Sequence, residues 1–341
     1  MIRFDSDYQE GCFPLILQRL QESNFEQTPG YGEDRHCRNA ADIIRDLCKA
    51  PQAEVHFLVG GTQTNSTVIS SQLRPHQGAL CASTGHIGVH ETGAIEHGGH
   101  KVLPLPSDDG KISASQVRLA LEEHFSDASR EHVVQPGMVY ISFPTEKGTI
   151  YSLDELEALH EVCGEAGIPL FIDGARLGYG LCSEGCDVTL PDIARCCDIF
   201  YIGGTKQGAL FGEAVVFCNP SLARDFRYLV KQGGGLLAKG RLLGIQFETM
   251  LGEGLYFQAA RKAVAQALRL KAALLDKGYP LFADSPSNQQ FPILDNATIA
   301  RLRGTFSFED WAKVDSGHTA VRFCTSWATT DEAVDRLISS L

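Results

Sequence analysis

The chain has 341 residues, of which 43% are hydrophobic and 21% are charged, and its formal net charge is −12. A chain of this length can bury a core that needs no metal or disulfide, and it suggests about two domains. The acidic balance and the lack of a dense lysine and arginine cluster argue against binding to nucleic acid or to a membrane surface.

Strand-like and helix-like segments alternate through residues 54–218. Apolar, β-branched and aromatic runs predict strands at 54–60, 78–83, 100–105, 137–143, 168–173, 199–203 and 213–218. Helices are expected after the glycine turn that ends the first strand, over 113–124, and from a capping box of Ser152 and Glu155 to Gly167. This alternation predicts an α/β fold with a large, mostly parallel central sheet.

The pattern changes after Gly235. Two long helical stretches, about 236–251 and 255–277, precede short strands near 290–294 and 320–324 and a helix at the C-terminus. We therefore expect a large domain over residues 1–250, whose N-terminal segment contributes to the active site, and a small C-terminal domain over residues 251–341.

Targeting and cysteine patterns indicate the compartment. No signal peptide is visible and no apolar run reaches the roughly 18 residues of a membrane helix, so we expect a cytoplasmic protein. The 11 cysteines are irregularly spaced, which is typical of free thiols. No metal site is expected, because Cys182, Cys186, Cys196 and Cys197 lack the paired spacing of zinc ligands.

Common nucleotide and hydrolase motifs are missing. No GxGxxG follows a predicted strand, and neither GxxxxGK[ST] nor GxSxG occurs. These absences weaken the case for nucleotide binding and for α/β-hydrolase chemistry.

Two predicted strands end in charged residues. Asp173 ends the strand at 168–173, and Lys206 follows the strand at 199–203. Because the carboxyl ends of parallel strands meet at one edge of a sheet, both side chains can face one site. A buried ion pair alone adds little stability over apolar residues. Pyridoxal 5′-phosphate (PLP) needs both groups, since its aldehyde forms a Schiff base with a lysine and its pyridine nitrogen needs a carboxylate.

A phosphate site is also available. Gly60, Gly61 and Thr62 lie between a predicted strand and a predicted helix start. Backbone N–H groups at a helix N-terminus bind phosphate, and Thr62 can add its hydroxyl group. A plain glycine turn is the alternative interpretation.

Motifs spread over most of the chain resemble those of a known family. They are DSD at 5–7, YGED at 31–34, GGT at 60–62, GHIGVHETGA at 85–94, FIDGAR at 171–176, TK at 205–206, GGG at 233–235 and VRFCT at 321–325. In this order and spacing they resemble the low-specificity L-threonine aldolases, in the β-eliminating lyase group of fold type I PLP enzymes. The resemblance implies the PLP-dependent transferase-like fold of aspartate aminotransferase.

The resemblance also implies roles at the cofactor. Lys206 is expected to form the Schiff base, Asp173 to pair with the pyridine nitrogen, and His86 to stack on the ring. The other residues expected to bind the cofactor are Gly60, Gly61, Thr62, Arg176 and Thr205.

The implied reaction is cleavage of a β-hydroxy-α-amino acid, such as threonine, allo-threonine or phenylserine, to glycine and an aldehyde. Ser6, Arg176 and Arg322 are expected to hold the substrate carboxylate, which an arginine fork binds well. The candidate bases are His86, His90 or a water that one of them orients. Glu91 follows on the same segment and is also expected at the site.

Other functions on the same scaffold remain open at this stage. β-Elimination and transamination use the same lysine and aspartate, and a non-catalytic PLP-fold binding protein is a third possibility. The expected partner is a small amino acid, with no nucleic acid and no membrane. The resemblance implies a homo-oligomer, either a dimer or a tetramer.

The sequence departs from the family in the loops around the site. The family arginine that helps to bind the phosphate across a subunit interface is Leu237 here, and Lys239 or Arg241 is a possible substitute. A family tyrosine near the substrate is His90, and the loop after the lysine reads TKQGALFGE. These changes bear on the substrate side chain more than on the cofactor.

Overall fold

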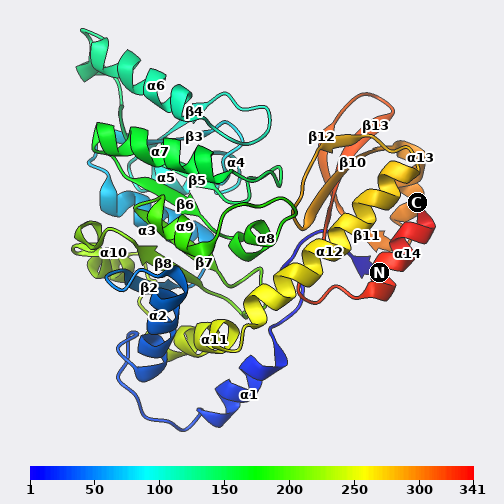
Figure 1. The fold of residues 1–341 in the computed structure, drawn as a ribbon, viewed down its shortest axis with the longest axis horizontal. Helices are drawn as coiled ribbons and strands as arrows, with labels where there is room; N and C mark the ends of the chain where they lie inside the picture. The colour runs from blue at the N-terminus through cyan, green and yellow to red at the C-terminus, as the bar shows by residue number, and fades with distance from the viewer.

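The computed structural model describes residues 1–341, and a seven-stranded sheet forms its largest layer (Figure 1). The strands lie in the order β2-β8-β7-β6-β5-β3-β4. They are β2 (Glu54–Leu58), β3 (Gln77–Ala82), β4 (Lys101–Leu105), β5 (Gln135–Ser142), β6 (Leu170–Asp173), β7 (Ile199–Gly203) and β8 (Glu213–Phe217). Only β8 runs against its neighbours, so the predicted mostly parallel sheet is confirmed.

The central strands are buried on both faces. Every residue of β6, β7 and β8 is buried, as expected for largely apolar strands in a sheet that is covered on both faces. Along β5, Met138 and Tyr140 belong to one buried cluster, whereas Val139 and Ile141 belong to the other. The sheet therefore has a hydrophobic core on each side.

Helices cover both cores. One side is packed by α2 (Arg35–Cys48), α6 (Ala114–Ser126), α7 (Leu153–Ala166), α9 (Leu190–Arg195) and α11 (Arg241–Gly252). The other is packed by α3 (Gly61–Gln72), α5 (Ala94–His97) and α10 (Phe226–Gln232). The predicted capping box of α7 is confirmed, because Ser152 and Glu155 bond reciprocally and Gly167 ends the helix at φ 65°.

A second sheet of four antiparallel strands lies beside the first (Figure 1). Its order is β12-β13-β10-β9, with β9 (Leu281–Ala283), β10 (Gln289–Asp295), β12 (Glu309–Lys313) and β13 (His318–Cys324). The helices around it are α12 (Leu255–Asp276), α13 (Asn296–Leu302) and α14 (Asp331–Ser340). In Figure 1, α12 runs from the seven-stranded sheet to this second sheet.

The N-terminal segment joins the C-terminal elements. Strand β1 (Ile2–Arg3) pairs with β11 (Phe306–Ser307), and Phe4 lies in the same core as Leu270 and Val334. Both chain ends therefore lie together in Figure 1. The first residues thus pack away from the seven-stranded sheet, although the expected boundary near residue 250 groups them with it.

Several elements differ from expectation. Helices α1 (Pro14–Glu22) and α2 were not predicted, and the helix expected over 236–251 begins at Arg241. The remaining elements are short: α4 (His86–Val89), α8 (Leu177–Leu181) and the 3-10 helices Arg130–His132 and Pro220–Ala223.

No helix combines the length and apolar character that crossing a membrane requires. No group of three or more His, Cys, Asp or Glu side chains is placed to hold a metal ion.

Candidate active site

A cavity of about 250 Å³ opens where the carboxyl ends of the central strands face the second sheet. Five residues expected from the sequence line it: His86, His90, Arg176, Lys206 and Arg322. The cavity walls also include Glu146, together with Tyr8, Glu309 and Trp311, and the sequence did not single out the last three as site residues. The tertiary structure therefore brings segments that are far apart in the chain to one place.

Asp173 is the last residue of β6, and its carboxylate accepts four hydrogen bonds. The Tyr140 hydroxyl (2.5 Å) and Asn65 Nδ2 (3.0 Å) donate to Oδ2. The Tyr201 hydroxyl (2.5 Å) and the Ala175 N–H (2.9 Å) donate to Oδ1. Each neighbouring strand, β5 and β7, supplies one tyrosine, and α3 supplies the asparagine, so the position of the carboxylate is strictly defined.

The charge on Asp173 is stabilised despite its burial. Burial alone would raise the pKa of this carboxyl group, but the charge of His86 and the hydrogen bonds from Tyr140 and Tyr201 outweigh it and lower the pKa. Asp173 is therefore an anion at neutral pH, as a partner for a protonated ring nitrogen must be.

His86 lies at the start of α4 and is oriented by a buried carboxylate. Its Nδ1 is 2.8 Å from Oε1 of Glu91, whose side chain has no exposed surface. Asn65 Nδ2 donates to the same Oε1 at 2.7 Å, so Asn65 connects Glu91 to Asp173. Because Nδ1 is engaged, Nε2 is the ring nitrogen of His86 that remains for other partners.

The pKa of His86 reflects these neighbours. Burial would lower it, but the hydrogen bond with Glu91 and the carboxylates of Glu146 and Asp173 raise it.

His90 is exposed at the cavity mouth, with its ring 5.5 Å from that of His86 and 6.3 Å from that of Trp311. The structure thus places both expected histidines in the cavity.

Lys206 follows the end of β7, and its side chain reaches into the cavity. Its Nζ lies 6.0 Å from the ring centroid of Tyr8. Burial and the positive charge of Arg176 lower the pKa of the lysine amine, although Asp7, Glu146 and Asp173 oppose this shift. A lysine in such surroundings has more of the unprotonated amine that Schiff-base formation needs.

The two expected arginines are held in different ways. Nε and Nη2 of Arg176 donate to the carboxylate of Asp7, at 2.7 and 3.0 Å. Arg322 on β13 forms an ion pair with Glu309, and its Nη1 donates to Gln289 at 3.1 Å. The guanidinium of each arginine is thus fixed by a carboxylate while it lines the cavity.

Trp311 owes its position to an irregularity in β12. The ladder between β12 and β13 shifts register between Asp310 and Ala312, on either side of Trp311. Such a bulge redirects a side chain. The indole ring lies 5.4 Å from the guanidinium carbon of Arg322 and 5.0 Å from the ring of Phe291.

Of the three residues expected to hold the substrate carboxylate, Ser6 does not line the cavity. It is buried, and its hydroxyl oxygen accepts a hydrogen bond from Gln9 Nε2 at 2.7 Å. Its neighbours in the chain, Asp7 and Tyr8, contact Arg176 and Lys206 instead.

The turn expected to bind phosphate has an open helix end. Gly60 is the residue before α3, and no side chain caps the helix. The N–H groups of Gly61, Thr62 and Gln63 have no intrahelical acceptor at this position. A Cβ on Gly60 would meet no atom within 4 Å, whereas one on Gly61 would lie 3.3 Å from the Tyr201 hydroxyl.

This helix end belongs to the same site. Asn65, one turn into α3, donates to Asp173, which ties the open N-terminus to the carboxylate. Thr205, the residue before Lys206, was expected to bind the cofactor. Its hydroxyl group donates to Glu213 at 2.8 Å and accepts from the Gly212 N–H at 3.1 Å. Its contacts therefore lie within the lysine loop.

Arg241, a possible substitute for the family arginine, lies elsewhere. Its guanidinium donates to the carbonyl oxygens of Ser23, Asn24 and Glu26 at 2.7, 3.2 and 2.9 Å. It holds the connection between α1 and α2 of its own chain, and a role at the phosphate of a neighbouring subunit stays a prediction.

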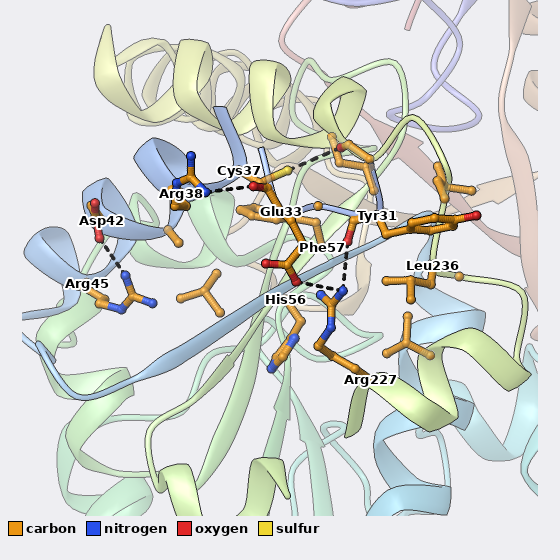
Figure 2. A pocket seen from close by; sticks show the side chains of 18 residues that line it. Tyr31, Glu33, Cys37, Arg38, Asp42, Arg45, His56, Phe57, Arg227 and Leu236 are labelled. Atoms are coloured by element: carbon orange, nitrogen blue, oxygen red, sulfur yellow. Dashed lines mark hydrogen bonds and ion pairs between the residues drawn. The ribbon is translucent and has the colours of Figure 1, made fainter. Parts of the chain in front are cut away.

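A larger hollow, of about 400 Å³, lies between α2, β2 and the segment from α10 to α11 (Figure 2). Figure 2 shows its charged side chains paired with one another: Arg45 with Asp42 at 2.6 Å, and Arg227 with Glu33 at 2.9 Å. None of the expected catalytic or cofactor residues lines it. Tyr31, at its edge, adopts a positive φ of 60°.

The residues of the smaller cavity fit PLP. They are an ionised carboxylate, a half-buried lysine with a lowered pKa, and an uncapped helix end with glycine at its first position, and Asn65 connects this helix to the carboxylate. These are the groups that the ring nitrogen, the aldehyde and the phosphate require. Asn65 and the two tyrosines on Asp173 are functional candidates that sequence reasoning missed.

Comparison with known proteins gives a family and close relatives. Residues 6–296 match the family described as Beta-eliminating lyase. The chain is 31% identical to a low specificity L-threonine aldolase of a Pseudomonas species, over 99% of this chain and 96% of that relative. A second such aldolase, of Pseudomonas aeruginosa, is 31% identical over 98% of this chain and 95% of its own length.

Solved structures agree. A threonine aldolase from Leishmania major is 45% identical and superposes with a TM-score of 0.96, covering 99% of this chain and 98% of that one. An aspartate aminotransferase of Thermus thermophilus, 14% identical, superposes with a TM-score of 0.70 over 99% of this chain and 95% of its own. The second likeness shows the fold alone, and it confirms the predicted fold class.

Proposed function

The chain belongs to the beta-eliminating lyases and, among them, to the low-specificity L-threonine aldolase family, and on that premise we propose how it acts. It is a PLP-dependent lyase that cleaves β-hydroxy-α-amino acids to glycine and an aldehyde. The observation that carries this proposal is the placement of Lys206 and Asp173 beyond neighbouring strands, with Arg176 and Arg322 in the same cavity.

The cofactor would be held at three points. Lys206 would bind the aldehyde carbon, Asp173 would keep a proton on the ring nitrogen, and the N–H groups at the start of α3 would bind the phosphate. When bound, PLP supplies an acceptor for the electron pair released from the Cα–Cβ bond. His86, beside Asp173 in this network, would lie against the ring.

The arginines would orient the substrate. Arg176 and Arg322 are the two guanidinium groups in the cavity, and together they can bind one carboxylate. Because Asp7 already occupies one edge of Arg176, the substrate would use the remaining N–H groups. This arrangement would set the Cα–Cβ bond at a fixed angle to the ring plane.

A base must remove the proton of the β-hydroxyl group. Nε2 of His86 is a candidate, because the Glu91 carboxylate behind Nδ1 stabilises the imidazolium that forms. His90 is the alternative, since its ring lies at the mouth of the same cavity. We propose that Glu91 acts through His86 rather than on the substrate.

The direct test is aldehyde release by purified protein with PLP added. L-Threonine, L-allo-threonine and L-phenylserine should yield glycine together with acetaldehyde or benzaldehyde, over many turnovers. Lys206→Ala should lose both turnover and the absorbance of the bound cofactor. Pyruvate and ammonia from serine would indicate β-elimination, stoichiometric keto acid would indicate transamination, and no product with cofactor bound would indicate a binding protein.

We also propose that the chain works in the cytoplasm as a homo-oligomer, a dimer or a tetramer. All 11 cysteines are free, which suits a reducing compartment. Large apolar side chains stand exposed, among them Phe25 at 95% and Tyr228 at 77% exposure, and such residues suit a subunit interface. Light scattering of the purified protein would measure its mass.

A further inference from the structure

Glu213 is a buried acid that the proposed reaction does not use. It is the first residue of β8, and its side chain is almost fully buried. Its backbone pairs with Gly203 at the end of β7 and with Leu58 at the end of β2. It therefore lies between the strand that leads to Lys206 and the strand that leads to the open end of α3.

The carboxyl group of Glu213 binds the two residues before Lys206. Its Oε1 accepts from the Thr205 hydroxyl at 2.8 Å, and its Oε2 accepts from the Gly204 N–H at 3.2 Å. The N–H groups of Gly204 and Thr205 also bond to the carbonyl oxygen of Gly212, at 3.0 and 3.2 Å. Gly212 adopts φ 120°, which only glycine readily does, so the turn is closed tightly against β8.

The charged and titratable groups around Glu213 come from four elements. Lys206 is in the turn itself, Asp173 ends β6, Tyr201 is on β7, and Tyr256 is on α12. Burial raises the pKa of Glu213 to about 8, although the Thr205 hydrogen bond and Lys206 oppose the shift. The carboxyl group is therefore largely protonated at neutral pH, whereas Asp173 beside it is an anion.

The protonation state of Glu213 affects the pKa of Lys206. An anionic Glu213 would stabilise the ammonium form of Lys206, which cannot form a Schiff base. A protonated Glu213 keeps the same hydrogen bonds to the turn without that effect. The family resemblance and the expected site residues do not assign any role to this position.

We propose that Glu213 is a positioning residue for Lys206. Its carboxyl group fixes the turn that carries the lysine, and it sets the pH range in which the lysine side chain is a neutral amine. This inference rests on the proposed role of Lys206. It does not depend on which bond of the substrate is cleaved.

The test compares Glu213→Gln and Glu213→Ala with the unchanged protein. Glutamine keeps the size and the accepting oxygen but cannot ionise. Glu248→Gln is the matched control, because Glu248 on α11 bonds to His36 and lies outside the cavity. In the full-length protein without cofactor, acetylation of Lys206 by limiting acetic anhydride, measured by peptide mass spectrometry over about pH 6 to 11, reports the titration of the amine.

We expect Glu213→Gln to move the Lys206 labelling curve to lower pH by about one unit, because the anion that forms in alkali is gone. The absorbance of the bound cofactor in the holoenzyme should shift with pH in the same direction. Glu213→Ala should release the cofactor on dialysis about tenfold faster, since the turn loses its anchor. Glu248→Gln should match the unchanged protein in all three measurements.

Labelling and absorbance curves of Glu213→Gln that superimpose on those of the unchanged protein would overturn the proposal. If Glu213→Ala does not fold, the glutamine variant alone decides. The labelling result is independent of turnover. A shifted curve without aldehyde release would remove the proposed reaction and keep this inference, whereas aldehyde release with an unshifted curve would do the opposite.

Discussion

Arg176 and Asp7 form a bidentate ion pair, with hydrogen bonds of 2.7 and 3.0 Å, although 169 residues separate them in the chain. Asn288 of the C-terminal part donates to the same carboxylate at 3.0 Å. Asp7 therefore joins the N-terminal segment, the central sheet and the second sheet at the wall of the cavity. The arginine expected to hold the substrate is itself held by the first few residues of the chain.

Asp7→Asn should destabilise the protein and weaken substrate binding. Removing one member of a buried ion pair costs about 3–5 kcal/mol, because the other charge is left unpaired. Urea unfolding at neutral pH measures this loss, and KM for threonine should rise more than kcat falls. Asp5→Asn, at a partly exposed carboxylate two residues away, is the control. An unchanged midpoint for Asp7→Asn would contradict the role of the pair.

The same ion pair makes the unfolding free energy of the protein depend on pH. Burial opposes the charge of Asp7, but Arg176 and Lys206 and the hydrogen bonds to Asp7 lower its pKa from 3.8 to about 2. Because the folded state binds this proton more weakly than the unfolded state, the stabilisation is complete above pH 3.8 and is lost as the pH falls toward 2. It amounts to about 2–3 kcal/mol. The difference between the unchanged protein and Asp7→Asn should therefore shrink as unfolding is measured at lower pH in this range.

Glu91→Gln should change the pH profile of turnover. The Glu91 carboxylate helps to raise the pKa of His86, so glutamine lowers that pKa. If neutral His86 is the base, the acid limb of kcat/KM moves to lower pH by about one unit, while kcat falls because the ring loses its orienting partner. Glu96→Gln, on the exposed side of α5, is the control. A fixed acid limb would point to His90 or to water as the base.

Tyr140→Phe should raise the pKa of Asp173. The variant removes one of two short hydrogen bonds that keep this carboxylate ionised, at a cost of about 1.5–3 kcal/mol in unfolding free energy. Since the pKa of Asp173 is lowered in the folded protein, its stabilisation is lost on acidification, and the loss should begin at higher pH in the variant. Cofactor affinity should fall in the same pH range.

Tyr151→Phe is the matched control for this prediction. Its buried hydroxyl accepts from the Ile112 N–H at 2.9 Å, away from Asp173. It should lower stability without moving the pH dependence of cofactor binding. Equal pH curves for both phenylalanine variants would show that Tyr140 has only a packing role.

Trp311→Ala should enlarge the cavity and loosen Arg322. The indole ring lies 5.4 Å from that guanidinium carbon, and loss of such a contact costs about 0.5–2 kcal/mol, so KM should rise for every substrate. The ratio of phenylserine to threonine turnover should also rise, because an aryl group can use the vacated space. Trp311→Phe should keep most of the affinity. Phe282→Ala, on β9 and outside the cavity, should change neither quantity.

Local sequence patterns determined much of the framework. The strand of residues 199–203 was predicted at the bounds that the structure has, and the capping box at Ser152 marks the true start of α7. Asp173 and Lys206 were placed at one edge of the sheet because strand direction follows from the βα alternation. These features depend on residues close together in the chain, and hydrophobic periodicity and capping report such features directly.

The residues that contact Asp173 and line the cavity could not be predicted from the sequence. Tyr140 and Tyr201 read as ordinary aromatic core residues inside apolar strands, and only the register of β5, β6 and β7 aims both hydroxyls at Asp173. Trp311 points into the cavity because of a bulge in β12, and this bulge depends on the pairing of β12 with β13. Each of these contacts joins segments that pack together only in the folded chain.

The sequence by itself determined which residue types stand at the carboxyl ends of the strands, and with them the lysine, the carboxylate and the glycine turn that PLP needs. The tertiary structure alone decided what surrounds them: Asp7 on Arg176, Glu91 on His86, and Glu213 beneath the lysine turn. The reason is physical. Backbone conformation follows from short-range sterics and hydrogen bonding, whereas the charge and orientation of a buried side chain depend on neighbours that long-range packing brings together.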